Sequence, residues 1–132
     1  MKRLLIPLLA ALALPTAVNA ETFYLKCTIT KSRGNPDKPF RTFEKPVKNN
    51  HQFTLNEDNQ SAIYFRAENG ISTKIDNVNF SDESIDMSYQ SGKRTISINR
   101  VTGEIFRQND LGFQYMQYLG YCKKSRPRKT LF

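Results

Sequence analysis

The chain has 132 residues, enough for one domain with a modest hydrophobic core. It carries 20 Lys and Arg residues against 12 Asp and Glu, with a formal net charge of +8 at pH 7. The excess is concentrated near the two ends of the chain, so the composition argues against a domain whose whole surface binds nucleic acid. Beyond residue 20, no apolar run is long enough to be a transmembrane helix.

Residues 1–20 have the layout of a cleavable secretory signal peptide. The layout consists of a positive start, an apolar core and small residues ahead of the cut: Lys2 and Arg3, residues 4–14, and Val18 and Ala20. The apolar core is much shorter than the roughly 20 residues that a spanning helix needs. We therefore expect cleavage after Ala20 and a periplasmic or secreted product.

From residue 21 to residue 122 the dominant pattern is an alternation of apolar and polar residues, which is typical of β-strands with one buried face. The clearest apolar positions are Phe23, Leu25, Cys27 and Ile29, then Phe53 and Leu55, Ile63 and Phe65, Ile85, Met87 and Tyr89, and Ile96 and Ile98. No stretch shows a convincing helical period. The sequence therefore predicts a single, mainly β, antiparallel domain over residues 21–122, with about eight strands.

Residues 31–50 do not follow this alternation. The segment contains Gly34, Pro36, Pro39 and Pro46 and is rich in Lys and Arg. Prolines remove backbone donors that a sheet needs, so we expect a long basic loop with, at most, a short edge strand at residues 40–43. Long loops in compact domains are often functional or disordered.

Two glycine turns predict hairpins. Asn69-Gly70 lies between two apolar stretches, and Asn-Gly is a strong hairpin signal because glycine adopts a positive φ at no steric cost. Thr102-Gly103 separates residues 95–99 from residues 104–108 in the same way.

Two irregularities are also expected. The apolar parity changes between Ile75 and Val78, which predicts a β-bulge at Asn77. Gly120 lies within the last predicted strand, residues 113–122, and indicates a bend or a close approach of another backbone.

Cys27 and Cys122 are the only two cysteines and lie near the two ends of the predicted domain. In an oxidising compartment such a pair is most simply a disulfide. The bond would bring the first and last strands together, as in an up-and-down barrel. A two-sheet sandwich with adjacent terminal strands meets the same constraint, and we favour the barrel narrowly.

No catalytic, metal or cofactor motif stands out, so we expect no cofactor and no metal ion. His51 is the only histidine, and it shares the apolar parity of Phe53 and Leu55, which favours a structural role. The alternative is a small secreted hydrolase, nuclease-like, in which His51 acts with Glu44 and Arg66.

Binding surfaces are better supported. The last predicted strand places Tyr115 and Tyr121 on one parity and Tyr118 on the other, and tyrosine is enriched at recognition surfaces. Residues 123–132 form a basic tail suited to an anionic surface such as lipid head groups or polysaccharide. Its basic residues are Lys123, Lys124, Arg126, Arg128 and Lys129. The interior of a barrel is a further candidate site, for a small apolar ligand.

Two stretches resemble a recurring pattern in uncharacterised secreted bacterial proteins. In residues 96–103, ISINRVTG, a strand ends in Asn-Arg and a Thr-Gly turn follows, and residues 120–124, GYCKK, close the domain with a Gly-x-Cys. The signal, residues 1–20, is similar to those of small exported proteins of marine picocyanobacteria. The resemblance implies a bacterial envelope or secreted location and brings no assigned activity.

These features predict an exported, non-enzymatic binding or interaction module of the cell envelope, without naming its ligand. A small secreted hydrolase centred on His51 is the alternative. A structural envelope protein that associates with itself is a third interpretation.

Overall fold

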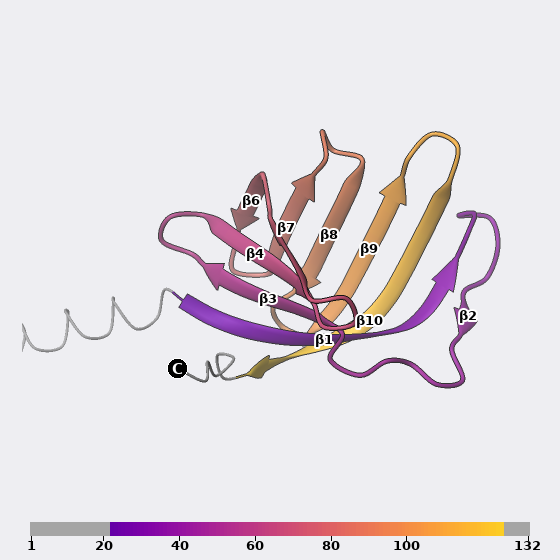
Figure 1. Ribbon diagram of the computed structural model, residues 1–132, viewed down its shortest axis with the longest axis horizontal. Helices are drawn as coiled ribbons and strands as arrows, with labels where there is room; N and C mark the ends of the chain where they lie inside the picture. Colours follow the sequence, from indigo (N-terminus) through magenta and orange to yellow (C-terminus); the bar gives the residue numbers. More distant parts are fainter. Residues whose placement is uncertain (1–21, 126–132) are drawn as a thin grey trace, which may run out of the picture.

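The computed structural model describes residues 22–125, which form ten β-strands and no helix (Figure 1). The strands are β1 (Thr22–Arg33), β2 (Arg41–Thr42), β3 (His51–Asn56), β4 (Ser61–Arg66), β5 (Ile71–Lys74), β6 (Asn77–Phe80), β7 (Ser84–Tyr89), β8 (Arg94–Asn99), β9 (Glu104–Asp110) and β10 (Tyr115–Ser125). In this described part, no helix is long and apolar enough to cross a membrane. The mainly β fold predicted from the alternation is confirmed.

All ten strands belong to one antiparallel sheet that curls into a half-barrel (Figure 1). The order across the sheet is β5-β4-β3-β1-β10-β9-β8-β7-β6, and β2 pairs with β1 beside this path. The structure follows the barrel-like alternative rather than the sandwich, because the strands form a single curled sheet. The first and last strands, β1 and β10, are neighbours in it.

The two edges of this sheet, β5 and β6, are consecutive in the chain and are joined by residues 75–76 alone. Ile75 is buried, and its N–H donates to the carbonyl of Ala62 on β4 at 3.0 Å. After Asp76 the chain pairs with β7 instead, starting at Asn77. The change in apolar parity therefore marks a break between two strands, and the predicted bulge at Asn77 is wrong.

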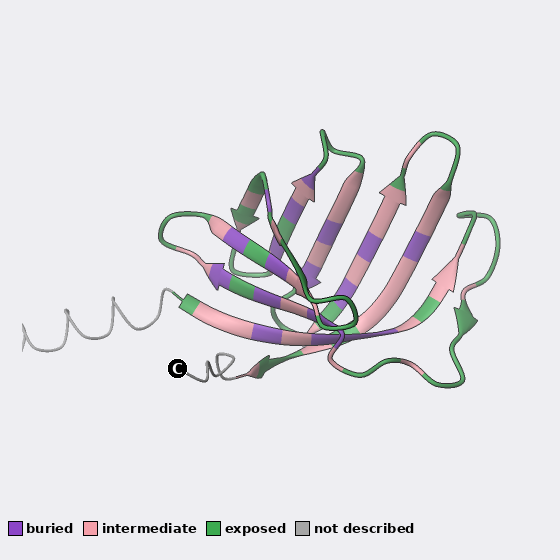
Figure 2. Ribbon diagram, viewed as in Figure 1, coloured by how far each residue is buried: buried purple, intermediate pink, exposed green. Residues whose placement is uncertain are grey.

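The inner face of the half-barrel holds the hydrophobic core. Buried positions alternate with more exposed ones along β3, β4, β7, β8 and β9, as Figure 2 shows. The largest fully buried apolar side chains are Phe53, Leu55, Ile85, Ile96 and Ile105. Burying a side chain of this size contributes roughly 1.5–3 kcal/mol relative to leaving it exposed, so these residues supply much of the stability of the fold.

Cys27 of β1 and Cys122 of β10 are directly opposite each other and form the predicted disulfide. Their Cα atoms are 4.0 Å apart. The N–H of Cys122 donates to the carbonyl of Gly103 at 2.7 Å, on the side away from β1. The two cysteines therefore form a non-hydrogen-bonded pair, the kind in which opposite side chains lie closest.

Gly120 permits a β-bulge in β1. The register of β1 against β10 shifts between Ile29 and Lys31. A Cβ atom on Gly120 would lie 2.8 Å from the Cα of Ile29 and closer still to the carbonyl oxygen of Thr28. Because no side chain fits there, the predicted close approach of backbones is confirmed.

Both predicted glycine hairpins are confirmed. The β4–β5 turn ends at Gly70, with φ 71°, and the β8–β9 turn ends at Gly103, with φ 84°. In each turn the glycine N–H donates to the last residue of the preceding strand, Arg66 or Asn99, at 2.8 Å. The left-handed φ explains why glycine occupies these positions.

Two predicted boundaries change. β1 continues to Arg33, so the long loop begins at residue 34 and contains β2, close to the expected edge strand. β10 continues to Ser125, so Lys123 and Lys124 pair with β1 and belong to the sheet rather than to the tail. In both cases the partner strand supplies backbone hydrogen bonds that composition does not reveal.

The long loop before β3 packs against β1. The N–H of Asn49 donates to the hydroxyl of Thr28 at 3.0 Å and so gives this buried threonine a hydrogen-bond partner. The N–H of Phe43 donates to the carbonyl of Thr30 at 2.8 Å. The loop is thus tied to the sheet, and it contributes Lys45 to one end of the half-barrel.

Candidate functional site

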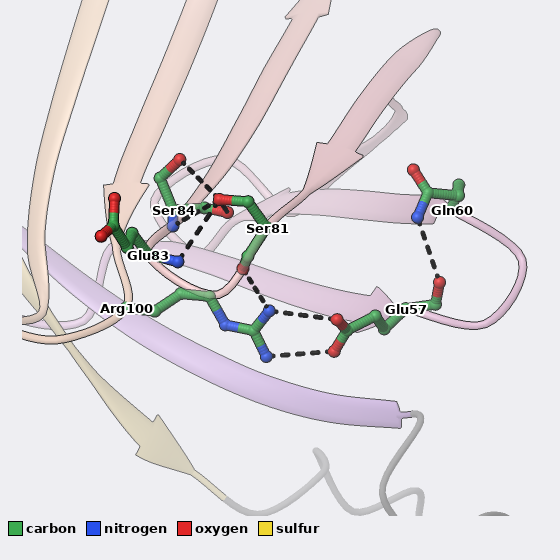
Figure 3. A network of polar contacts seen from close by, with 6 residues as sticks. All are labelled: Glu57, Gln60, Ser81, Glu83, Ser84 and Arg100. Carbon is green, nitrogen blue, oxygen red and sulfur yellow. Dashed lines mark hydrogen bonds and ion pairs between the residues drawn. The ribbon is translucent and has the colours of Figure 1, made fainter.

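One end of the half-barrel is held by a contact between Arg100 and Glu57, shown in Figure 3 and called here the clamp. The two terminal nitrogens of Arg100 donate to the carboxylate of Glu57 at 3.1 and 3.0 Å, and one of them also donates to the carbonyl of Ser81 at 2.7 Å. Hydrogen bonding from Arg100 lowers the pKa of Glu57. Glu57 follows β3, whereas Ser81 and Arg100 follow β6 and β8, so the clamp joins the two walls of the half-barrel.

The opposite end contains a cavity of about 250 Å³, called here the arginine pocket. Its polar lining comprises Lys45, Asn50, His51, Arg66, Glu68, Arg94, Arg107, Asn109 and Tyr118, and its apolar lining comprises Ile29, Phe43 and Val47. Four of these residues are basic, and only Glu68 is acidic. The pocket therefore has an excess of positive charge.

Strand geometry explains why these side chains converge. In a strand, residues two positions apart point to the same face of the sheet. Along β9, Arg107 follows the buried Ile105 by two positions. The same spacing relates Arg94 to Ile96 on β8, Arg66 to Tyr64 on β4, and His51 to Phe53 on β3. At this end of the half-barrel the inward-facing residues are polar, whereas the inward-facing residues further along the same strands are apolar.

Arg107 is the most unusual residue of the pocket. Its side chain is only 4% exposed, and its Nε has no hydrogen-bond partner. The guanidinium lies 5.5 Å from the ring centre of Tyr64 and 5.4 Å from that of Tyr118, within cation–π range of both. Among the described residues it forms no ion pair. Buried arginines are normally paired with a carboxylate, and this one has only the two aromatic rings.

Arg66 and Arg94 are partly engaged. Arg66 forms an ion pair with Glu68 at 3.0 Å, while its buried Nε has no partner. Glu68 also accepts a hydrogen bond from the side-chain amide of Asn50 at 3.0 Å, and these two neighbours lower the pKa of Glu68. The Nε of Arg94 donates to the amide oxygen of Gln90 at 2.6 Å. Both arginines therefore retain donor capacity.

His51 is buried beside Tyr64 and is joined to it by a hydrogen bond between its Nδ1 and the tyrosine hydroxyl. Burial, together with the positive charges of Arg107 and Arg66, lowers the pKa of His51 to about 3. Burial raises the pKa of Tyr64 to about 12, against the opposing effect of the arginines. Both side chains are therefore neutral at pH 7.

The residues of the hydrolase hypothesis are brought together only in part. His51 and Arg66 both line the arginine pocket, and they lie opposite each other on β3 and β4. Glu44 lies in the exposed loop and is not part of the lining, in which the carboxylate is that of Glu68. No carboxylate of residues 22–125 is hydrogen-bonded to His51.

The three predicted tyrosines do not share one surface. Tyr118 lies opposite Arg107 and faces the pocket. Tyr115 points to the other face, where its hydroxyl donates to the side chain of Gln108 at 3.1 Å and accepts from that of Gln117 at 2.7 Å. Tyr121 is exposed on that outer face. Only Tyr118 therefore contributes to the pocket.

The predicted basic residues lie at the clamp end or outside the described residues. Lys123 and Lys124 are exposed and line a second cavity, of about 960 Å³, next to the clamp. The ammonium of Lys124 lies 5.8 Å from the ring centre of Phe23. Arg126, Arg128 and Lys129 lie outside the described residues. Lys123 and Lys124 are thus at the opposite end of the half-barrel from the arginine pocket.

In residues 22–125, no group of three or more His, Cys, Asp or Glu side chains is placed to hold a metal ion. No known protein family, curated protein or solved structure matches this chain. Its function has to be inferred from the geometry of its own residues. Sequence analysis did not single out Arg94 or Arg107, although an arginine at the apolar parity of a strand is a visible signal.

Proposed function

We propose that this chain is an exported, non-enzymatic binding module of the bacterial envelope that takes an anionic group of its ligand into the arginine pocket. Export is supported by the signal-like residues 1–20 and is compatible with the disulfide between Cys27 and Cys122. The observation that carries the proposal is the buried guanidinium of Arg107, which has no carboxylate partner among residues 22–125.

The energetics of Arg107 favour a ligand. Removing a charged group from water costs several kcal/mol unless a partner of opposite charge replaces the water. Arg107 occupies an inward position next to the core, where an apolar side chain of similar length would avoid this cost. A bound anion would supply the missing partner through charge-assisted hydrogen bonds, each contributing about 1.5–3 kcal/mol. The position of Arg107 is therefore better explained by ligand binding than by a contribution to the stability of the fold.

The hydrolase alternative is less well supported. A general base works best when its pKa is near the working pH, whereas the pKa of His51 is about 3. Its Nδ1 is also occupied by Tyr64. The alternative predicts that the wild-type protein cleaves a nucleic-acid substrate and that the His51→Gln variant does not. Binding without any cleavage would favour the module.

The proposal is tested by thermal unfolding and calorimetric titration of the oxidised protein with acetate, citrate, phosphate and sulfate at constant ionic strength. Because a ligand stabilises the state that binds it, at least one anion should raise the melting temperature of the wild type. Arg107→Met should abolish this effect while making the anion-free protein as stable as the wild type or more so.

The matched control is Arg41→Met, which removes an exposed arginine of β2 that is not part of the pocket. It should leave the anion effect unchanged. A wild type that no anion stabilises, together with an Arg107→Met variant that is less stable than it, would show that Arg107 is structural and would overturn the proposal.

A further inference from the structure

Building on the proposed function, we infer that the arginine pocket accepts a terminal tetrahedral oxyanion, a phosphate or sulfate monoester, in preference to a carboxylate. Three observations support this choice: the placement of the arginines on opposite walls, the donors that they leave free, and the volume of the pocket.

The arginines surround the pocket. Arg66 comes from β4, on one side of the curled sheet, whereas Arg94 and Arg107 come from β8 and β9 on the other side. Lys45 approaches from the long loop. The charges of all three arginines act on the same buried group, Tyr64, and lower its pKa against the effect of burial. An anion in the arginine pocket would therefore be close to positive charges from both walls and from the long loop.

Donors without a hydrogen-bond partner occur on both walls. The Nε atoms of Arg66 and Arg107 are buried without partners, and they belong to opposite walls. A carboxylate has two oxygens in one plane and is satisfied by a single guanidinium fork. It would leave the arginine of the opposite wall without a hydrogen bond to the ligand. A phosphate or sulfate monoester has three terminal oxygens arranged around a tetrahedral centre, so it can accept from both walls at once.

The volume favours a terminal group. A cavity of 250 Å³ corresponds to about eight water molecules at about 30 Å³ each. That space holds a five-atom oxyanion and a short stub of the molecule that carries it. The remainder of the ligand would extend out of the pocket. A monoester needs one exit, whereas a diester within a nucleic-acid chain needs two.

The experiment is calorimetric titration of the oxidised protein with methyl phosphate, methyl sulfate, acetate and dimethyl phosphate at fixed pH and ionic strength. Methyl phosphate or methyl sulfate should bind at least about tenfold more tightly than acetate, since one additional charge-assisted hydrogen bond corresponds to about that factor. Dimethyl phosphate should bind at least about tenfold more weakly than methyl phosphate.

Variants of two pocket arginines, both from the wall formed by β8 and β9, provide the structural check. Arg107→Met and Arg94→Met should each weaken binding of the monoester by about tenfold or more, while Arg41→Met should not change it. Because Arg94 is partly exposed, its variant keeps the test informative if Arg107→Met does not fold. If both variants bind the monoester as tightly as the wild type does, the inference is overturned.

The possible outcomes separate the inference from the proposed function. Acetate binding as tightly as the monoesters would overturn the tetrahedral preference and leave anion binding intact. Absence of binding by every anion would overturn both. A repeat at pH 5 and pH 8 separates the two esters, because a phosphate monoester loses its second proton near pH 6 and a sulfate monoester has no such step.

Discussion

Arg100 holds Glu57 through two hydrogen bonds and thereby connects two turns on opposite walls of the half-barrel. The residues are 43 positions apart in the chain. The edge strands β5 and β6 do not pair with each other, so the sheet is open between them. The contact between Arg100 and Glu57 helps to hold the two walls together at this opening.

Replacing Arg100 by Ala should lower the free energy of unfolding by about 1 kcal/mol, the upper end for an exposed ion pair. The effect should shrink at high salt. Because the folded-state pKa of Glu57 is lowered, this stabilisation is present above the ordinary glutamate pKa and is lost as the pH falls through the folded-state value. Urea unfolding at two salt concentrations measures it, with Arg41→Ala as the control. An equal loss in both variants would show that the clamp contributes nothing specific.

Removing the disulfide should have a larger effect. The bond joins residues separated by 95 positions, and closing a loop of this length removes denatured-state entropy worth about 4–5 kcal/mol in the chain model. The variant Cys27→Ala with Cys122→Ala should therefore unfold at a much lower denaturant concentration. Alkylation of the denatured, unreduced wild type should label no thiol. Two labelled thiols would contradict the bond.

Gly120→Ala should destabilise the fold by about 2 kcal/mol or more, because the new methyl group would collide with the backbone of Thr28 and Ile29. Gly34→Ala is the matched control, since its Cβ would lie 3.6 Å from the nearest atom, the sulfur of Met116. Chemical denaturation compares the two. Similar stabilities would mean that β1 shifts to accommodate the methyl group.

The pKa of His51 makes a prediction about pH. The folded-state pKa is about 3 and the ordinary value is 6.5, so the folded protein binds fewer protons between these limits. Stability should be fully present above pH 6.5 and should fall as the pH decreases from 6.5 toward 3, by up to about 1.4 kcal/mol per pH unit. His51→Gln should remove this part of the slope. An imidazole NMR signal of the folded protein that titrates near pH 6.5 would refute it.

The basic tail yields a separate prediction from the sequence alone. Deleting residues 126–132 should weaken binding to vesicles that contain anionic lipid and should flatten its salt dependence. The deletion starts after Ser125 because β10 extends to this residue. A sedimentation assay at several salt concentrations measures it, with uncharged vesicles as the control. Unchanged binding would direct attention to the basic loop of residues 34–50.

Much of the fold could be predicted because it depends on local rules. The alternation around Phe53, Ile85 and Ile98 reports directly which face of those strands is buried. In β4 the prediction from Ile63 and Phe65 was wrong, because Ala62 and Tyr64 are the buried residues and Ile63 is exposed. Gly70 and Gly103 mark turns for steric reasons. The break after Ile75 was not predictable, because a parity change does not tell whether a strand keeps its neighbour or exchanges it.

The arginine pocket was not predicted because it depends on register. Arg66 and Arg107 are far apart in the sequence and meet only through the curl of the sheet. Neither arginine, taken by itself, shows which other side chains it faces. Tyr118 was selected for its aromatic ring, whereas its placement next to Arg107 follows from the pairing of β9 with β10. Long-range pairing is the information that single-sequence patterns lack.

The junction at residues 75–76 has a consequence for how the chain can be connected. The two ends of the described chain are already side by side, since Tyr24 lies opposite Ser125. A circular permutant that joins these ends through a short linker and opens the chain between Ile75 and Asp76 would begin with β6 and finish with β5. Its main strands would then follow one another along the chain in the order in which they lie across the sheet. In its strand order the chain is therefore a simple meander, with the two ends of the described chain at the neighbouring strands β1 and β10 instead of at the sheet edges. The disulfide joins these two strands.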